Sequence, residues 1–510
     1  MSVGSSRPLA RWALARWAPA LAVAAFAALW TSRWESFPIG PDPAYHLAIA
    51  RQVVAAGGPI GYEWWEAAPE GRPHLYPPTL HLLLAGLLKA GVDPLACLRL
   101  LSAALPVAWL LALFLAASRL FGEAIGCCAL WAGLLPFSAH LAAAMTMAST
   151  LACIELLWLM VAIEEGRAIA AGALVALLGY THLGLPLIAG TAVVAYGIAR
   201  PAVRPVIGRA AWGMALIGPW WWHLWRHQDW LRLVGREENA WIQFLPFLYM
   251  LAAAGLWTCL RRRGRWLWLP ACLAGFLWLA PYHRYRWLSG EGVMPVVLLA
   301  AVGLDRLAGR RRRRGMAVAA LWIALALLPS WTRTAEGWRW RWRDSAPWHV
   351  TGVSDDRASG IDVTLASAPL VRWANVVAAR TRPDEILWSN APYAGGLVAA
   401  LAGRATSSAM LADVPARAAD PISAAHAIWW AKIEELPRAR RTWTPIAEDA
   451  IAAFFRQAGE RPGAHPPAAA CPLMLAWAGI AALIAAAAWD LARLRRTAGI
   501  NTCYNVGLPP

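Results

Sequence analysis

The sequence predicts an α-helical protein that crosses a membrane many times. Hydrophobic residues make up 59% of its 510 residues, charged residues only 15%, and the mean hydropathy is +0.44. An ordinary soluble domain carries about 25% charged residues, so this composition excludes one. Arginine runs between apolar segments account for much of the net charge of +17, as the positive-inside rule requires. We therefore expect a lipid bilayer as a partner, and no nucleic acid.

Apolar segments separated by arginine-containing loops predict about twelve spans, with both termini cytoplasmic and a location in the cell membrane. The expected spans are Trp12–Trp30, Leu98–Ser118, Ala124–Pro136, Ser149–Ile163, Ala168–Tyr180, Leu183–Ala199, Trp212–Trp225, Trp241–Leu260, Trp266–Ala280, Gly292–Leu307, Met316–Trp331 and Leu473–Leu491.

One apolar piece, Thr79–Ala90, is too short for a bilayer core that needs about 20 residues. The pair Pro77-Pro78 comes just before it, where proline favours the start of a helix. We expect an interfacial or re-entrant helix that stays on the outer side. This choice keeps the later arginine runs on the cytoplasmic side.

These spans divide the chain into a transmembrane domain 1–331, with a large first outer loop 31–97, an extracytoplasmic region 332–472, a last span 473–492 and a cytoplasmic tail 493–510. The extracytoplasmic region is expected to be α/β. Glu385–Asn390 reads as a buried strand, followed by an apolar helix that ends at Ala402. Further helices are expected at Ala424–Leu436 and around Ala447–Ala458.

The stretch Gly40–Leu47 follows the first span and carries a carboxylate, a phenol and an imidazole: Asp42, Tyr45 and His46. Asp42 lies between prolines, which predicts an extended backbone. A carboxylate at the outer surface can act as a general base on an acceptor hydroxyl, or orient an acceptor amine. The alternative is a turn or helix-capping aspartate.

Basic and imidazole side chains elsewhere are expected in the same outer layer. His81 lies about one turn into the short apolar helix. Arg284 and Arg286 lie in a short outer loop, where arginine is unusual. An arginine pair there suits a phosphate, although contact with anionic lipid is the alternative. His182 lies at a break between spans and can reach this layer or make an interhelical hydrogen bond.

The sequence carries no phosphate-binding glycine motif and no cluster with metal-ligand spacing. Nucleotide use is therefore unsupported, no cofactor is assigned, and a divalent metal is compatible with the chain but unsupported.

A family resemblance rests on four features in chain order. The first is the acidic residue Asp42 in a large first outer loop, and the second is Pro77-Pro78 opening a short helix. The third is Arg99-Leu100-Leu101-Ser102 leading into a span, and the fourth is Arg119-Leu120-Phe121-Gly122 before the next. Together they resemble the GT-C superfamily, above all protein mannosyltransferases and bacterial aminoarabinose transferases. The Gly-x-Asp-x-x-Tyr-His opening is also similar to oligosaccharyltransferases.

The resemblance implies an enzyme that moves a sugar from a polyprenyl-phosphate carrier to a glycan, lipid or protein acceptor on the outer face. Asp42 would be the catalytic acid of the first loop, and Arg284 or Arg286 would bind the phosphate. The chain departs from the family in having Pro43 after Asp42 and no acid in Ser138–Ser149. A non-catalytic lipid-carrier-binding or assembly protein is therefore an alternative, and a transporter or flippase is a further one.

Overall fold

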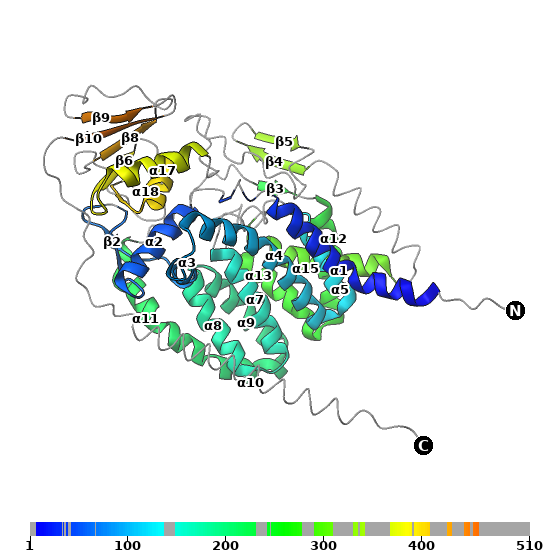
Figure 1. The fold of residues 1–510 in the computed structure, drawn as a ribbon. Helices are drawn as coiled ribbons and strands as arrows, with labels where there is room; N and C mark the ends of the chain where they lie inside the picture. Colours follow the sequence, from blue (N-terminus) through cyan, green and yellow to red (C-terminus); the bar gives the residue numbers. More distant parts are fainter. Residues whose placement is uncertain are drawn as a thin grey trace, which may run out of the picture.

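The computed structural model describes residues 7–32, 34, 37–38, 42–66, 68–136, 148–230, 242–244, 246–277, 290–309, 330–334, 337–341, 368–389, 392–407, 426–430, 443–448 and 452–457. Most of these residues are helical, and Figure 1 shows the helices gathered into one bundle with an α/β unit at one end.

The helices of the bundle are α1 (Arg7–Thr31), α4 (Pro94–Phe121), α5 (Glu123–Gly133), α7 (Ala148–Glu164), α8 (Ala168–Thr181), α9 (Leu185–Ala199), α10 (Arg204–Ala210), α11 (Trp212–Arg226), α12 (Pro246–Arg262), α13 (Trp268–Leu277) and α15 (Val293–Ala308). Most of them match predicted spans where the structure describes them. Helix α10 lies in none of those spans, and the predicted span Trp241–Leu260 begins with the strand Ile242–Phe244. The predicted spans Met316–Trp331 and Leu473–Leu491 lie outside the described residues, except that Ser330 and Trp331 begin a strand.

Helix α4 has clear start and stop signals. The Asp93 side chain accepts a hydrogen bond from the Ala96 N–H at 3.0 Å, Pro94 occupies the first turn, and Gly122 ends the helix with φ of +105°. Among the described residues, α4 is the one helix long and apolar enough to cross a membrane by itself. The pair Leu185–Ala199 and Pro201–Ala210 also passes together, bent by 119°. Several shorter apolar helices have 10–17 residues, so about twelve spans remains a prediction.

Charged residues from several loops meet at one end of the bundle, where α10 lies in Figure 1. Arg119 and Arg167 both form ion pairs with Glu165, and Arg200 pairs with Glu164. These loops were expected to share the cytoplasmic side, and the structure brings them together. The predicted alternation of these spans therefore agrees with the fold.

The short apolar helix is α3 (Thr79–Lys89), as expected. Its first hydroxyl, Thr79 Oγ1, donates a hydrogen bond to the Tyr180 carbonyl at 2.8 Å, at the end of α8. Helix α3 also packs against α2 (Asp42–Ala56). Helices α2 and α3, which belong to the predicted first outer loop, thus lie at the end of the bundle opposite α10 (Figure 1).

The α/β unit contains α17 (Ala368–Arg380), α18 (Pro392–Ala402) and a five-stranded sheet in the order β7-β6-β8-β10-β9. Its strands are β6 (Ile386–Ser389), β7 (Ala405–Thr406), β8 (His426–Trp430), β9 (Trp443–Glu448) and β10 (Ala452–Gln457). Strand β6 is parallel to β7 and β8, and the other pairs are antiparallel. The predicted strand at Glu385–Asn390 is confirmed.

The predicted helices at Ala424–Leu436 and Ala447–Ala458 are wrong, because β8, β9 and β10 occupy those stretches. Alanine-rich sequence favours a helix locally, but pairing with β6 and burial of Ile428 and Phe454 stabilise strands instead.

The α/β unit is joined by hydrogen bonds to α2 and to the segment that follows it. Arg51 Nη2 on α2 donates to the Leu401 carbonyl of α18 at 2.9 Å. Thr406 N donates to the Trp65 carbonyl at 2.7 Å. Apart from this unit, a small sheet contains β3 (Ile242–Phe244), β4 (Ser330–Thr334) and β5 (Gly337–Arg341). The α/β unit therefore lies directly beside α2, at the same end of the bundle (Figure 1).

Candidate functional site

Asp42 is the first residue of α2, and it is half-buried. The predicted extended backbone is wrong at this position. Pro43 lies in the first helical turn, where its missing N–H removes no helical hydrogen bond, so a proline there is compatible with a helix. The helix dipole stabilises a negative charge at this end. The alternative interpretation, a helix-starting aspartate, therefore describes the backbone better.

One turn after Asp42, two predicted site residues meet a third. His46 Nδ1 lies 2.9 Å from His81 Nε2 on α3, and Tyr45 packs edge-on against both imidazoles. All three side chains are at most 2% exposed. The structure thus brings together Tyr45, His46 and His81, which lie up to 36 residues apart in the chain.

Both imidazoles are neutral at physiological pH. Burial, together with repulsion from His74, lowers the pKa of His46 to about 3. Burial also lowers the pKa of His81, as do His46 and His74. Since neither ring is charged, one nitrogen of the pair carries the hydrogen and the other accepts it.

The neutral pair predicts acid sensitivity. Below a pH of about 6.5 the unfolded chain binds a proton at each histidine while the folded protein does not, so stability falls as pH falls. Each histidine should contribute about 1.4 kcal/mol per pH unit below that point. We expect the unfolding midpoint in detergent to drop from pH 7 to pH 5, and to drop less in His46→Gln. A midpoint independent of pH over this range would contradict the prediction.

A buried charge cluster lies beside the imidazoles. The short ladder of β1 (Tyr62–Glu63) and β2 (Arg72–Pro73) sets Glu63 opposite Arg72. Arg72 Nε donates to Glu63 and Nη2 donates to Glu66, and all three side chains are at most 2% exposed. The turn between the strands needs a glycine at position 71 for two reasons. The φ of Gly71 is +68°, and a Cβ there would lie 2.5 Å from the Glu63 carbonyl oxygen.

Glu63 connects this cluster to α2. Its Oε2 accepts a hydrogen bond from the Tyr45 hydroxyl at 2.9 Å and lies 3.0 Å from His74 Nδ1. Burial opposes the charge of Glu63, but Arg72 and His74 hold its pKa below the ordinary value. Burial, reinforced by Glu63, raises the pKa of Tyr45. Tyr45 is therefore a neutral donor to a charged carboxylate, and this bond holds the first turn of α2.

Double substitutions test this connection. Glu63 touches both Tyr45 and Arg72, whereas the described bond of Glu66 is with Arg72. We expect the double variant Tyr45→Phe/Glu63→Gln to lose less stability than the sum of the two single variants, by about 1 kcal/mol or more. The reason is that each single substitution already weakens the same hydrogen bond. Tyr45→Phe and Glu165→Gln, whose ion pairs lie at the opposite end of the bundle, should add within about 0.5 kcal/mol. Unfolding midpoints of the single and double variants measure both values, and additivity in both pairs would exclude the connection.

His182 does not join this cluster through its described contacts. Its Nδ1 accepts hydrogen bonds from the N–H groups of Gly184 and Leu185, each at 3.1 Å. These contacts cap the start of α9, a role that neither sequence interpretation anticipated. Arg284 and Arg286 lie outside the described residues, so their expected role stays a prediction.

Sequence reasoning missed Glu63 and Glu66 as parts of the site. Their signal was the segment Glu63-Trp64-Trp65-Glu66, which places two carboxylates three residues apart between aromatic side chains in the predicted first outer loop. Among the described residues, no group of His, Cys, Asp and Glu side chains has the arrangement of a metal site.

No protein-family model matches the sequence, and no curated protein sequence matches it. Solved structures do match. ArnT from Cupriavidus metallidurans in the apo state superposes with a TM-score of 0.56 at 14% identity, over 87% of this chain and 98% of that chain. The same protein bound to undecaprenyl phosphate gives 0.56 at 17% identity, over 86% and 97%.

Two further proteins match over most of this chain. The oligosaccharyltransferase AglB from Archaeoglobus fulgidus, in complex with an inhibitory peptide and a dolichol-phosphate, gives a TM-score of 0.52 at 11% identity, over 82% of this chain and 70% of that chain. The arabinofuranosyltransferase AftD from Mycobacteria gives 0.54 at 15%, over 87% and 40%. All three proteins are membrane glycosyltransferases of the GT-C superfamily. The resemblance seen in the sequence is confirmed: the chain has the GT-C fold.

Proposed function

We propose that the protein is an integral membrane glycosyltransferase that moves a sugar from a polyprenyl-phosphate donor to an acceptor on the outer face of the membrane. The observation that carries this proposal is the position of Asp42, at the start of α2 and one turn from the buried Tyr45, His46 and His81, in a chain with the GT-C fold. ArnT and AglB have each been solved with a polyprenyl phosphate, which supports the class of donor.

In the proposed reaction Asp42 takes the proton of an acceptor hydroxyl, or orients an acceptor amine, as the acceptor attacks the anomeric carbon. The bond between that carbon and the lipid phosphate oxygen breaks, and the phosphate leaves on its carrier. A single displacement of this kind inverts the anomeric configuration. Asp42 suits the task because it is half-buried on a rigid helix, close to the surface where a lipid-linked headgroup would arrive.

The expected role of Arg284 and Arg286 is to bind the carrier phosphate and to neutralise it as it leaves. Replacing both by alanine should weaken binding of undecaprenyl phosphate by about 10-fold to 100-fold, because charge-assisted hydrogen bonds are lost. Calorimetry of the purified protein in detergent measures this affinity. Unchanged affinity would exclude the role, and a matched variant, Arg261→Ala with Arg262→Ala, controls for the general loss of positive charge.

A transfer assay tests the proposed function. Membranes that contain the protein are given a panel of labelled polyprenyl-phosphate sugars, and control membranes lack the chain. The proposal predicts that at least one donor passes its label to an acceptor only where the protein is present. If every donor keeps its label, the proposal is wrong.

A further inference from the structure

Helix α2, which begins with Asp42, packs against both the α/β unit and α3. Its buried side chains, among them Leu47 and Val53, share one hydrophobic core with Trp373 of α17 and Val398 of α18. The same core extends to α3 and the first turns of α4, whereas no described side chain of α2 belongs to the core of the helical bundle. The α/β unit therefore helps to set the position of the helix that carries Asp42.

The second half of α2 is fixed to the end of α18 by Arg51. Arg51 Nη2 donates a hydrogen bond to the Leu401 carbonyl at 2.9 Å, and the last carbonyl groups of a helix carry a partial negative charge that favours a cation. Arg404 binds the same end of α18, where its Nη1 donates to the Ala402 carbonyl at 2.8 Å. Its Nη2 donates to the Ala378 carbonyl of α17 at 3.0 Å. Arg404 thus joins α17 to α18, and Arg51 ties α2 to the end of that pair.

Gly403 allows the guanidinium of Arg51 to approach this helix end. The φ of Gly403 is +69°, and a Cβ there would overlap Arg51 Nη1. A side chain at this position would therefore strain the backbone and push the guanidinium away from the Leu401 carbonyl. We call Arg51, Leu401 and Gly403 the α2–α18 joint.

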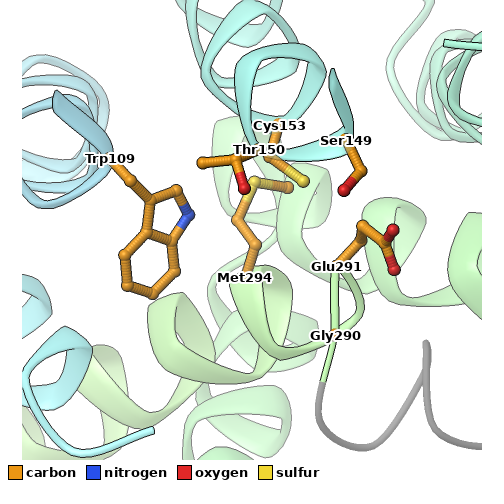
Figure 2. A pocket seen from close by; sticks show the side chains of 7 residues that line it. All are labelled: Trp109, Ser149, Thr150, Cys153, Gly290, Glu291 and Met294. Atoms are coloured by element: carbon orange, nitrogen blue, oxygen red, sulfur yellow. The ribbon is translucent and has the colours of Figure 1, made fainter. Parts of the chain in front are cut away.

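The start of α2 is held separately, by the bundle. His46 shares a hydrogen bond with His81 of α3, and α3 is bound through Thr79 to the end of α8. The bundle itself is closely packed: the cavity between α4, α7 and the residues that lead into α15 has a volume of about 20 Å³, enough for one or two water molecules (Figure 2). Helix α2 is thus a rod that the bundle holds near its start and the α/β unit holds at Arg51.

These two anchors set the angle of α2, and the angle decides where Asp42 lies. Asp42 precedes His46 by one turn, about 6 Å along the helix axis. A tilt of roughly 10° about His46 would therefore move Asp42 by about 1 Å. A displacement of about 1 Å in a reacting group costs on the order of 100-fold in rate. The α2–α18 joint is the anchor that resists such a tilt.

We propose that Arg51 is a positioning residue for the transfer reaction: through the α2–α18 joint, the α/β unit holds α2 at the angle that directs the Asp42 carboxylate toward the acceptor. The proposal rests on the proposed glycosyltransferase function and gives the α/β unit a part in it. In this role Arg51 exchanges no proton with the substrates and acts through α2.

Kinetics of Arg51→Met separate positioning from a loss of stability. We expect kcat to fall about tenfold or more while KM for the donor changes less than about twofold, because Asp42 acts in the transfer step and not in donor binding. Arg200→Met is the matched control, since it breaks the ion pair with Glu164 at the opposite end of the bundle. At a temperature where both variants are folded, Arg200→Met should keep the wild-type kcat. An unchanged kcat in Arg51→Met, or an equal loss in Arg200→Met, would overturn the proposal.

A double variant tests whether Arg51 and Gly403 act as one joint. Gly403→Ala should also lower kcat, because the new Cβ displaces the Arg51 guanidinium. Once the guanidinium is gone, Gly403→Ala has little left to displace, so Arg51→Met with Gly403→Ala should be about as slow as the slower single variant. Losses that multiply in the double variant would show that the two residues act independently, which contradicts the proposal.

Amide hydrogen exchange of the purified protein tests the joint without any substrate. In Arg51→Met the amides of residues 46 and 47, a full turn before Arg51, should exchange at least about threefold faster than in the wild type, because the loosening extends along α2. Arg200→Met should leave them unchanged. Faster exchange confined to the residues beside Arg51 and Leu401 would overturn the proposal. If no donor is active but the expected exchange is observed, the proposed function fails and the control of α2 by the α/β unit stands.

Discussion

Replacing Asp42 by asparagine is expected to lower sugar transfer by about 10²-fold to 10⁴-fold, which is the usual contribution of a general base. Asparagine has nearly the same size and is equally suited to the start of a helix, so α2 should form as before. Expression and membrane insertion should therefore match those of the wild type, and the unfolding midpoint should fall only slightly, because the helix dipole loses one favourable charge. Initial rates with a saturating donor measure the loss.

Asp93→Asn is a matched control, because Asp93 caps α4 with its carboxylate and an asparagine oxygen can accept the same hydrogen bond. This variant should retain nearly full activity. Full activity of Asp42→Asn would remove Asp42 from the proposed mechanism, and equal losses in the two variants would point to a general effect of lost charge.

Replacing Arg72 by methionine is expected to destabilise the protein by about 3–5 kcal/mol. The change leaves Glu63 and Glu66 charged, buried and without the guanidinium that joins them. Glu63 also holds Tyr45, so the first turn of α2 should loosen and activity should fall together with stability. The unfolding midpoint in detergent and the transfer rate report these effects.

A triple variant separates charge from shape. If Arg72→Met is combined with Glu63→Gln and Glu66→Gln, no unpaired charge remains, and much of the lost stability should return. A triple variant less stable than Arg72→Met alone would contradict this electrostatic explanation. Arg380→Met, at the exposed C-terminal end of α17, should change stability little and serves as the control.

The sequence predicted most helices of the bundle because their signals are local. Long apolar segments bounded by arginine, and the pair Pro77-Pro78 before Thr79, locate helices without knowledge of their partners. The strands β8, β9 and β10 could not be located in this way. The strands themselves hold only one or two alanines each, but the alanine, glutamate and lysine residues that flank β8 and β10 favour a helix, and pairing in the sheet decides for strands.

The candidate site, like the fold, could be predicted only in part: its residues could be proposed from the sequence, but their contacts could not. Asp42, Tyr45, His46 and His81 could be proposed as site residues because polar groups beside a predicted membrane span are unusual. The hydrogen bond between His46 and His81 joins residues 35 positions apart, and the one between Tyr45 and Glu63 joins residues 18 apart. No periodicity links such positions. Their contact depends on how α2, α3 and the β1–β2 turn pack, which is a property of the folded chain.

The measurement that tests the central claim most directly follows both products of the reaction. The purified protein in liposomes is given an active polyprenyl-phosphate sugar together with an acceptor, and released carrier phosphate and transferred sugar are quantified over time. A glycosyltransferase should form carrier phosphate and glycosylated acceptor in equal amounts. The Asp42→Asn variant should form both products far more slowly than the wild-type protein. A protein that binds the donor without releasing any carrier phosphate would be a lipid-carrier-binding protein, which would contradict the proposed function.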